Sequence, residues 1–110
     1  MAKNIKLLVY PAKDVGKARV FFTKFLGVEP YVDSPYYVGY KVGELEVGLT
    51  PSEPVGPIAY TDVVDIKVSL KEMTDAGAVV VQDVRDVAQG LLVAKVKDAN
   101  GNVVGFRQQT

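Results

Sequence analysis

Two strand-like segments carry the side chains with the most chemical potential in this chain. The first, "LEVGLT", contains Glu46 two residues before Gly48, and the second, "NVVGFRQ", contains Arg107 two residues after Gly105. A carboxylate can hold a cationic group or remove a proton, and a guanidinium can bind a carboxylate or phosphate through two hydrogen bonds. Because side chains alternate along a strand, each charged residue is expected to share a face with its glycine.

Two missing residue types limit this chemistry. The chain has no cysteine and no histidine. Thiolate catalysis, disulfides and thiolate metal sites are therefore excluded, as is the imidazole that usually binds zinc or acts as a base near neutral pH. Acid–base chemistry would fall to Asp, Glu, Lys or Tyr, and any metal would have to be a hard ion such as magnesium or calcium.

Each of these features also has a purely structural explanation. A glycine within a strand commonly marks a bulge, a bend or a packing concession. Glu46 would pair with Lys41 across a hairpin, an interaction worth about 0.2–1 kcal/mol. Arg107 would be a solvated charge near the end of a strand. Both interpretations stay open at this point.

The overall composition excludes several kinds of partner. The chain has 110 residues, with 13 basic and 13 acidic side chains that are scattered rather than clustered. This balance gives no reason to expect a nucleic-acid partner. The apolar runs are too short to span a bilayer, and the first residues lack the apolar core of a signal peptide. We therefore expect a cytoplasmic protein with no membrane partner.

The first half of the chain contains the elements that would position Glu46 and Gly48. "IKLLVY" has strand composition, and Asp14 is placed to cap a helix whose apolar stripe is Val15, Ala18, Phe22, Phe25 and Leu26. "YYVGYKV" and "LEVGLT" flank Gly43-Glu44, which is typical of a two-residue hairpin. In that register Gly39 lies opposite Gly48, and Tyr37 can cover the gap. Tyr36 and Tyr40 have the opposite parity and, with Tyr10, are expected to pack under the helices.

The second half repeats this pattern. After "PSEPVGPI", Asp65 caps a second helix, 51 residues after Asp14, and Gly105 follows Gly48 by 57 residues. Each half therefore contains a strand, a helix and three strands. We predict a single domain over residues 1–110, made of module 1 over about 1–50, a linker at 51–57 and module 2 over about 58–110. The helices are expected near 14–26 and 65–76.

Two motifs give the chain a resemblance to a known family. The pattern Asp-x-x-x-Ala-x-x-Phe-Phe-x-x-x-Leu-Gly is formed by Asp14, Ala18, Phe21, Phe22, Leu26 and Gly27, and the closing turn by Asp98, Gly101 and Asn102. With the repeated modules, these motifs make the whole chain resemble the vicinal oxygen chelate superfamily, which includes glyoxalase I, bleomycin-resistance proteins and extradiol dioxygenases. Ala99 and Asn100 depart from the usual turn.

The resemblance implies an α+β fold of two βαβββ modules. Their curled mixed sheets would carry the helices on the convex face and a ligand cleft on the concave face. Metal enzymes of this group place four metal ligands on the first and last strands of the modules. Those positions fall here on Leu7, Gly48, Ala59 and Gly105, none of which can bind a metal through its side chain. The resemblance therefore implies a vacated metal site, with no metal and no cofactor.

These observations predict a small-molecule binding protein that works without a metal and sequesters a hydrophobic or aromatic compound. No catalytic residue is assigned. The alternatives are a glyoxalase-, isomerase- or dioxygenase-like enzyme that uses Glu46 or Tyr37, and a protein with a vestigial cleft and a macromolecular partner. We also predict a symmetric homodimer that forms through "VEPYVDSPYY" and "PVGPIAY". Thr61 is expected to supply a hydroxyl from the face of Ala59. The predicted ligand-binding residues are Leu7, Tyr37, Glu46, Gly48, Ala59, Thr61, Gly105 and Arg107.

Overall fold

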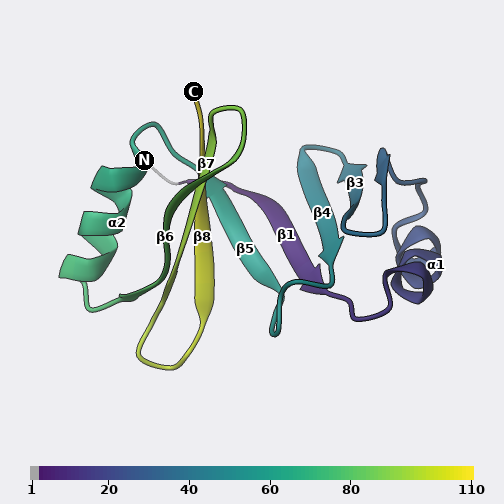
Figure 1. The fold of residues 1–110 in the computed structure, drawn as a ribbon, viewed down its shortest axis with the longest axis horizontal. Coiled ribbons are helices and arrows are strands. Elements are labelled where there is room, and N and C mark those ends of the chain that lie inside the picture. The colour runs from purple at the N-terminus through teal and green to yellow at the C-terminus, as the bar shows by residue number, and fades with distance from the viewer. Residues whose placement is uncertain (1–2) are drawn as a thin grey trace. The chain divides into compact units, whose positions relative to one another are not determined.

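A computed structural model describes residues 3–110 and confirms the predicted α+β class. The described residues form eight strands and two helices, in which the order strand, helix and three strands occurs twice (Figure 1). The chain divides into two compact units. The first unit is Lys6–Ile58, and the second unit is Ala59–Thr110 together with residues 3–5.

The first unit is a four-stranded mixed sheet with one helix. Its elements are β1 (Ile5–Pro11), α1 (Val15–Leu26), β2 (Val32–Asp33), β3 (Val38–Val42) and β4 (Leu45–Thr50). The strand order is β2-β3-β4-β1, in which β1 is parallel to β4 and β3 is antiparallel to β4. As predicted, Gly39 lies opposite Gly48 and Lys41 lies opposite Glu46. Asp14 caps α1 by accepting a hydrogen bond of 3.0 Å from the Lys17 amide.

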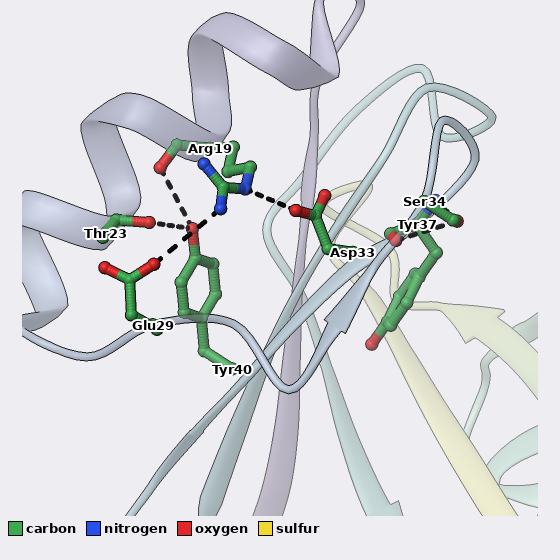
Figure 2. Close-up of polar contacts among 7 residues, drawn as sticks. All are labelled: Arg19, Thr23, Glu29, Asp33, Ser34, Tyr37 and Tyr40. Atoms are coloured by element: carbon green, nitrogen blue, oxygen red, sulfur yellow. Dashed lines mark hydrogen bonds and ion pairs between the residues drawn. The ribbon is translucent and has the colours of Figure 1, made fainter.

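Helix α1 covers one face of this sheet, where Val38, Tyr40, Val47 and Leu49 are buried. The Tyr40 hydroxyl reaches the helix, where it lies 2.9 Å from the Thr23 hydroxyl and donates to the Arg19 carbonyl at 3.1 Å (Figure 2). The rings of Tyr10 and Phe22 are 4.9 Å apart. The helix-facing positions of Tyr10 and Tyr40 are therefore confirmed.

Tyr36 does not pack under the helix, and the expectation for it was wrong. It is 79% exposed because the residues before Val38 form a turn instead of a strand. In that turn the Ser34 hydroxyl accepts hydrogen bonds from the amides of Tyr36 and Tyr37, at 3.3 and 3.1 Å. The alternation of side chains along β3 therefore does not extend back to Tyr36.

The second unit repeats the arrangement of the first. Its elements are β5 (Ile58–Asp62), α2 (Ile66–Asp75), β6 (Val79–Ala88), β7 (Leu91–Lys97) and β8 (Val103–Gln109). The strand order is β5-β8-β7-β6, and β5 is parallel to β8. Helix α2 packs over Ala94, Val96 and Phe106 through Ile66 and Leu70. Asp65 caps it by accepting from two amides, those of Lys67 at 3.1 Å and Val68 at 3.2 Å.

The turn between β7 and β8 is organised by one carboxylate. Asp98 accepts hydrogen bonds from the amides of Asn100 and Asn102 and from the Asn102 side chain, at 2.9, 2.8 and 3.0 Å. The side-chain hydrogen bond from Asn102 is the main reason why the pKa of Asp98 lies below its ordinary value.

Of the helices in the described residues, none has the length and apolar character needed to cross a membrane.

Candidate functional site

The sheet face opposite α1 in the first unit carries the glycine pair predicted from the sequence. A Cβ atom built on Gly48 would lie 2.7 Å from two ring carbons of Tyr37 and nearer still to its hydroxyl. A Cβ atom on Gly39 would lie 3.0 Å from the Tyr37 ring and 3.1 Å from the Tyr31 ring. We expected Tyr37 to cover this gap, and it does. The space directly above both glycines is therefore filled by tyrosine rings and is not an open cavity.

Local hydrogen bonds hold both tyrosines in place. The Ser34 hydroxyl fixes the backbone of Tyr37, because it donates to the Tyr37 carbonyl and accepts from the Tyr37 amide, both at 3.1 Å (Figure 2). The Tyr31 amide donates to the Gly39 carbonyl at 2.8 Å, which places Tyr31 beside the glycine pair. Because glycines have no side chain, the rings can lie against the backbone of β3 and β4.

Glu46 lies on the same face and is held by a phenol. The Tyr31 hydroxyl donates to a Glu46 carboxylate oxygen at 2.5 Å. The Lys41 ammonium lies 4.6 Å from the centre of the Tyr31 ring, which is the geometry of a cation–π contact. Leu7 pairs with Glu46 in the β1–β4 register and is buried. Leu7, Tyr37, Glu46 and Gly48 are therefore together on one face, as predicted.

In the second unit, a tyrosine ring again lies over the glycine. A Cβ atom on Gly105 would lie 2.8 Å from the Tyr60 Cζ atom and nearer still to two other ring carbons. The β5–β8 register pairs Tyr60 with Gly105 and Asp62 with Arg107. The Arg107 guanidinium donates to the Asp62 carboxylate at 2.8 Å, and the arginine side chain is only 15% exposed. Arg107 shares the face of Gly105, as predicted, and it is not simply a solvated charge.

Ala59 and Thr61 do not share this face, contrary to our expectation. They pair with Val104 and Phe106, which pack toward α2. The Thr61 hydroxyl oxygen is buried and has no hydrogen-bond partner among residues 3–110. The expectation was wrong because Ala59 follows Leu7 by 52 residues, whereas the helix caps repeat after 51. A slip of one residue moves a strand's side chains to the opposite face.

The sequence analysis missed several residues of these faces. Tyr60 is the residue that follows Val9 by the cap spacing of 51, and Val9 pairs with Gly48 as Tyr60 pairs with Gly105. The repeat was therefore a usable signal for Tyr60. Lys95 lies opposite Gly105 in the β7–β8 register, but no sequence pattern indicated the faces of β7. The other residues that were missed are Tyr31 and Asp62.

The two faces offer aromatic surface and few free charges. Within residues 3–110 there is no group of three or more acidic side chains arranged to hold a metal ion. Glu46 is bonded to Tyr31, and Arg107 is bonded to Asp62. What remains on each face is a glycine-lined strip of backbone under a tyrosine ring.

Comparisons with known proteins identify the fold. No protein-family model matches the sequence, and no curated protein matches it. Among solved structures, a glyoxalase/bleomycin resistance protein/dioxygenase superfamily member from Vibrio splendidus 12B01 has a TM-score of 0.73 and 17% identity, covering 99% of this chain and 100% of that one. Methylmalonyl-CoA epimerase from Streptomyces coelicolor, in complex with 2-nitronate-propionyl-CoA, has a TM-score of 0.72 and 12% identity, covering 100% and 99%.

A third similar structure carries the name of an activity that differs from those of the first two. It is called an NAD-dependent benzaldehyde dehydrogenase from Legionella pneumophila, and it has a TM-score of 0.76 and 15% identity, covering 94% of this chain and 98% of that one. Identities this low establish a shared fold and no more. Since one fold supports many activities, function has to be argued from the residues of the two faces.

Proposed function

We propose that this protein binds a small, uncharged aromatic or hydrophobic compound without a metal ion. The proposed sites are the two sheet faces on which a tyrosine ring lies over a glycine. Binding of this kind needs shape, apolar surface and a few polar contacts, and it needs no catalytic group.

The observation that carries this proposal is the fit of the Tyr37 ring over Gly48. A six-membered ring already lies within contact distance of this backbone strip, and Gly39 continues the strip onto the next strand. A surface that accepts the flat ring of Tyr37 is complementary to the flat ring of a ligand. The ligand would displace Tyr37 and stack against Tyr31, because aromatic pairs are most stable when offset-stacked or edge-to-face.

The ion pairs and hydrogen bonds of these faces favour an uncharged ligand. A ligand amine would compete with Tyr31 for Glu46, and a ligand carboxylate would compete with Asp62 for Arg107. Breaking either contact leaves a charged group less well satisfied, which opposes binding of a charged ligand. The absence of ligating side chains at Leu7, Gly48 and Gly105 supports binding that is independent of a metal.

Titration with 1-naphthol tests the proposal. Three of the six tyrosines, Tyr31, Tyr37 and Tyr60, lie on the proposed faces, so saturation-transfer NMR detects binding and shifts in the NMR signals of these three rings locate it. We expect Tyr37→Ala to increase the affinity for naphthol, because the ring no longer competes for the strip. Gly48→Leu should abolish binding at this face, because its side chain fills the same space.

The matched control is Tyr36→Ala, which removes a neighbouring tyrosine that is 79% exposed, whereas the atoms nearest to a Cβ on Gly39 or Gly48 belong to Tyr31 and Tyr37. It should bind naphthol like the parent protein. Equal naphthol binding by the parent, Tyr37→Ala and Gly48→Leu proteins would contradict the proposal. A parent protein that prefers naphthoate or naphthylmethylamine to naphthol would contradict the argument that the ligand is uncharged.

We further propose that the protein is a symmetric homodimer. The two segments singled out for this contact contain exposed apolar side chains, including Tyr36 and Val55, which are 79% and 57% exposed. Exposed apolar surface of this kind is stabilised by burial against a second copy. Sedimentation velocity at micromolar concentration tests the proposal, and a monomer there would contradict it without affecting the ligand site.

A further inference from the structure

Helix α1 has an outer face that is apolar and exposed. Val20, Phe21 and Phe25 are 59%, 63% and 70% exposed, although the sequence placed Phe25 in the same apolar stripe as Phe22 and Leu26, which pack against the core. The rings of Phe21 and Phe25 are nearly parallel, with centres 6.1 Å apart. Lys17 and Lys24 complete a shallow depression with these three residues. We call these five residues the α1 outer face.

The fold does not explain why this face is apolar. Helix α1 packs on the sheet of the first unit through Val15, Ala18, Phe22 and Leu26. Phe21 and Phe25 touch only the rim of that core, through edge-to-face contacts with Phe22 at 5.2 and 6.2 Å. The outward side of a surface helix is normally polar, and contiguous exposed apolar side chains mark interaction sites.

The α1 outer face carries positive charge and no negative charge. Helix α1 contains no acidic residue, and no carboxylate within residues 6–58 forms an ion pair with Lys17 or Lys24. The helix's third cation, Arg19, is used elsewhere, since its guanidinium lies 2.8 Å from Asp33 and 3.8 Å from Glu29 (Figure 2). The outer face therefore presents two unneutralised ammonium groups beside its phenylalanine rings.

We propose that the α1 outer face is a docking surface for an acidic amphipathic segment of another protein. Leucine-like side chains of that segment would fill the depression between Val20 and the two phenylalanines. Its flanking carboxylates would meet Lys17 and Lys24. Residues 17, 21 and 25 are spaced by four, so the partner's anchors would recur once per helical turn.

Charge complementarity disfavours the two other obvious occupants. A second copy of the chain would bring its own Lys17 and Lys24 against this face across a two-fold axis, which gathers four ammonium groups with no carboxylate. Anionic membranes are typically recognised by clusters of about four to eight basic residues, whereas this face has two and the chain has no net charge. An acidic protein segment matches both the charge and the small size of the depression.

Two synthetic helical peptides test the proposal. They share one stripe of leucines, and their flanking residues are glutamates in one and lysines in the other. We expect the acidic peptide to shift the amide NMR signals of residues 17–25 and to bind at least about tenfold more tightly than the basic one. Phe25→Ala should weaken binding of the acidic peptide about tenfold, as is typical for a central aromatic anchor.

Reversing the charges of Lys17 and Lys24 separates loss of binding from loss of folding, because a variant that gains affinity for the basic peptide must still be folded. The double variant Lys17→Glu/Lys24→Glu should prefer the basic peptide, whereas Lys67→Glu on α2 should bind both peptides like the parent. The proposal is overturned if neither peptide binds at millimolar concentration or if the shifted signals lie outside α1. It is also overturned if phosphatidylglycerol vesicles bind more tightly than the acidic peptide, or if Phe25→Ala abolishes self-association instead of peptide binding.

Discussion

The ring of Tyr37 lies directly over Gly48, so that a Cβ atom on the glycine would fall 2.7 Å from two of the ring's carbon atoms. The second unit repeats this relationship with Tyr60 and Gly105. Each glycine is therefore required by a particular tyrosine, and this dependence can be measured.

Gly48→Ala should lower the free energy of unfolding by about 1 kcal/mol, because the added methyl group pushes the end of the Tyr37 ring out of its position. In a Tyr37→Ala background, the same substitution should become neutral or stabilising, since alanine is favoured over glycine in a strand. Urea denaturation of the four proteins in this double-mutant cycle measures the coupling. If Gly48→Ala has the same effect in both backgrounds, the ring is not the reason for the glycine.

Gly105→Ala should be more destabilising, by about 2–3 kcal/mol. Tyr60 is only 7% exposed and belongs to strand β5, so its ring has less freedom to move than the ring of Tyr37. Thermal and urea denaturation of Gly48→Ala and Gly105→Ala, compared side by side, check this order. If Gly105→Ala lowers the free energy of unfolding less than Gly48→Ala does, the Tyr60 ring moves aside more readily than the Tyr37 ring.

The two helix caps should differ in strength. Asp65 accepts from two amides and Asp14 from one, so Asp65→Ala should cost about 1–2 kcal/mol and Asp14→Ala about 0.5–1 kcal/mol of unfolding free energy. Asp65→Asn should retain most of the stability, because its side-chain oxygen accepts the same hydrogen bonds. Equal losses for the two alanine variants would show that the second amide contributes nothing.

Asp98 should contribute to the pH dependence of stability. Its pKa in the folded chain lies below the ordinary value of 3.8, chiefly because Asn102 donates to the ionised carboxylate. The resulting stabilisation is present above pH 3.8 and is lost as the pH falls through the lower pKa of the folded state.

Asp98→Asn should therefore be less stable than the parent at about pH 7, and the difference should shrink at about pH 2. Urea denaturation across this pH range measures it. A difference that stays constant with pH would mean that the carboxylate charge is not involved.

Elemental analysis of protein purified without chelators should find no stoichiometric nickel, zinc, iron or manganese. The physical reason is that the sequence contains no histidine or cysteine, and that Leu7, Gly48 and Gly105 have no ligating atoms in their side chains. A stoichiometric transition metal would contradict the interpretation of the glycines as part of a metal-free site.

Much of the fold could be read from local signals in the sequence. Asp14 and Asp65 mark the helix starts because a carboxylate before an apolar stripe satisfies free amides, and Gly43-Glu44 sets the hairpin register because a left-handed glycine suits a tight turn. That register already placed Gly39 opposite Gly48 and Tyr37 near them. These inferences depend only on residues near one another in the chain.

Tertiary pairing decided what lies on each face of the sheets. Ala59 and Thr61 face α2, and Tyr60 covers Gly105, because the β5–β8 register joins residues about forty-five apart, as in the pair Asp62–Arg107. Tyr31 reaches Glu46 only because β2 lies beside β3, and Phe25 is exposed because Phe22 and Leu26 already cover the sheet. Side-chain alternation shows which residues share a face within one strand, but only pairing between distant strands shows which face that is and what covers it.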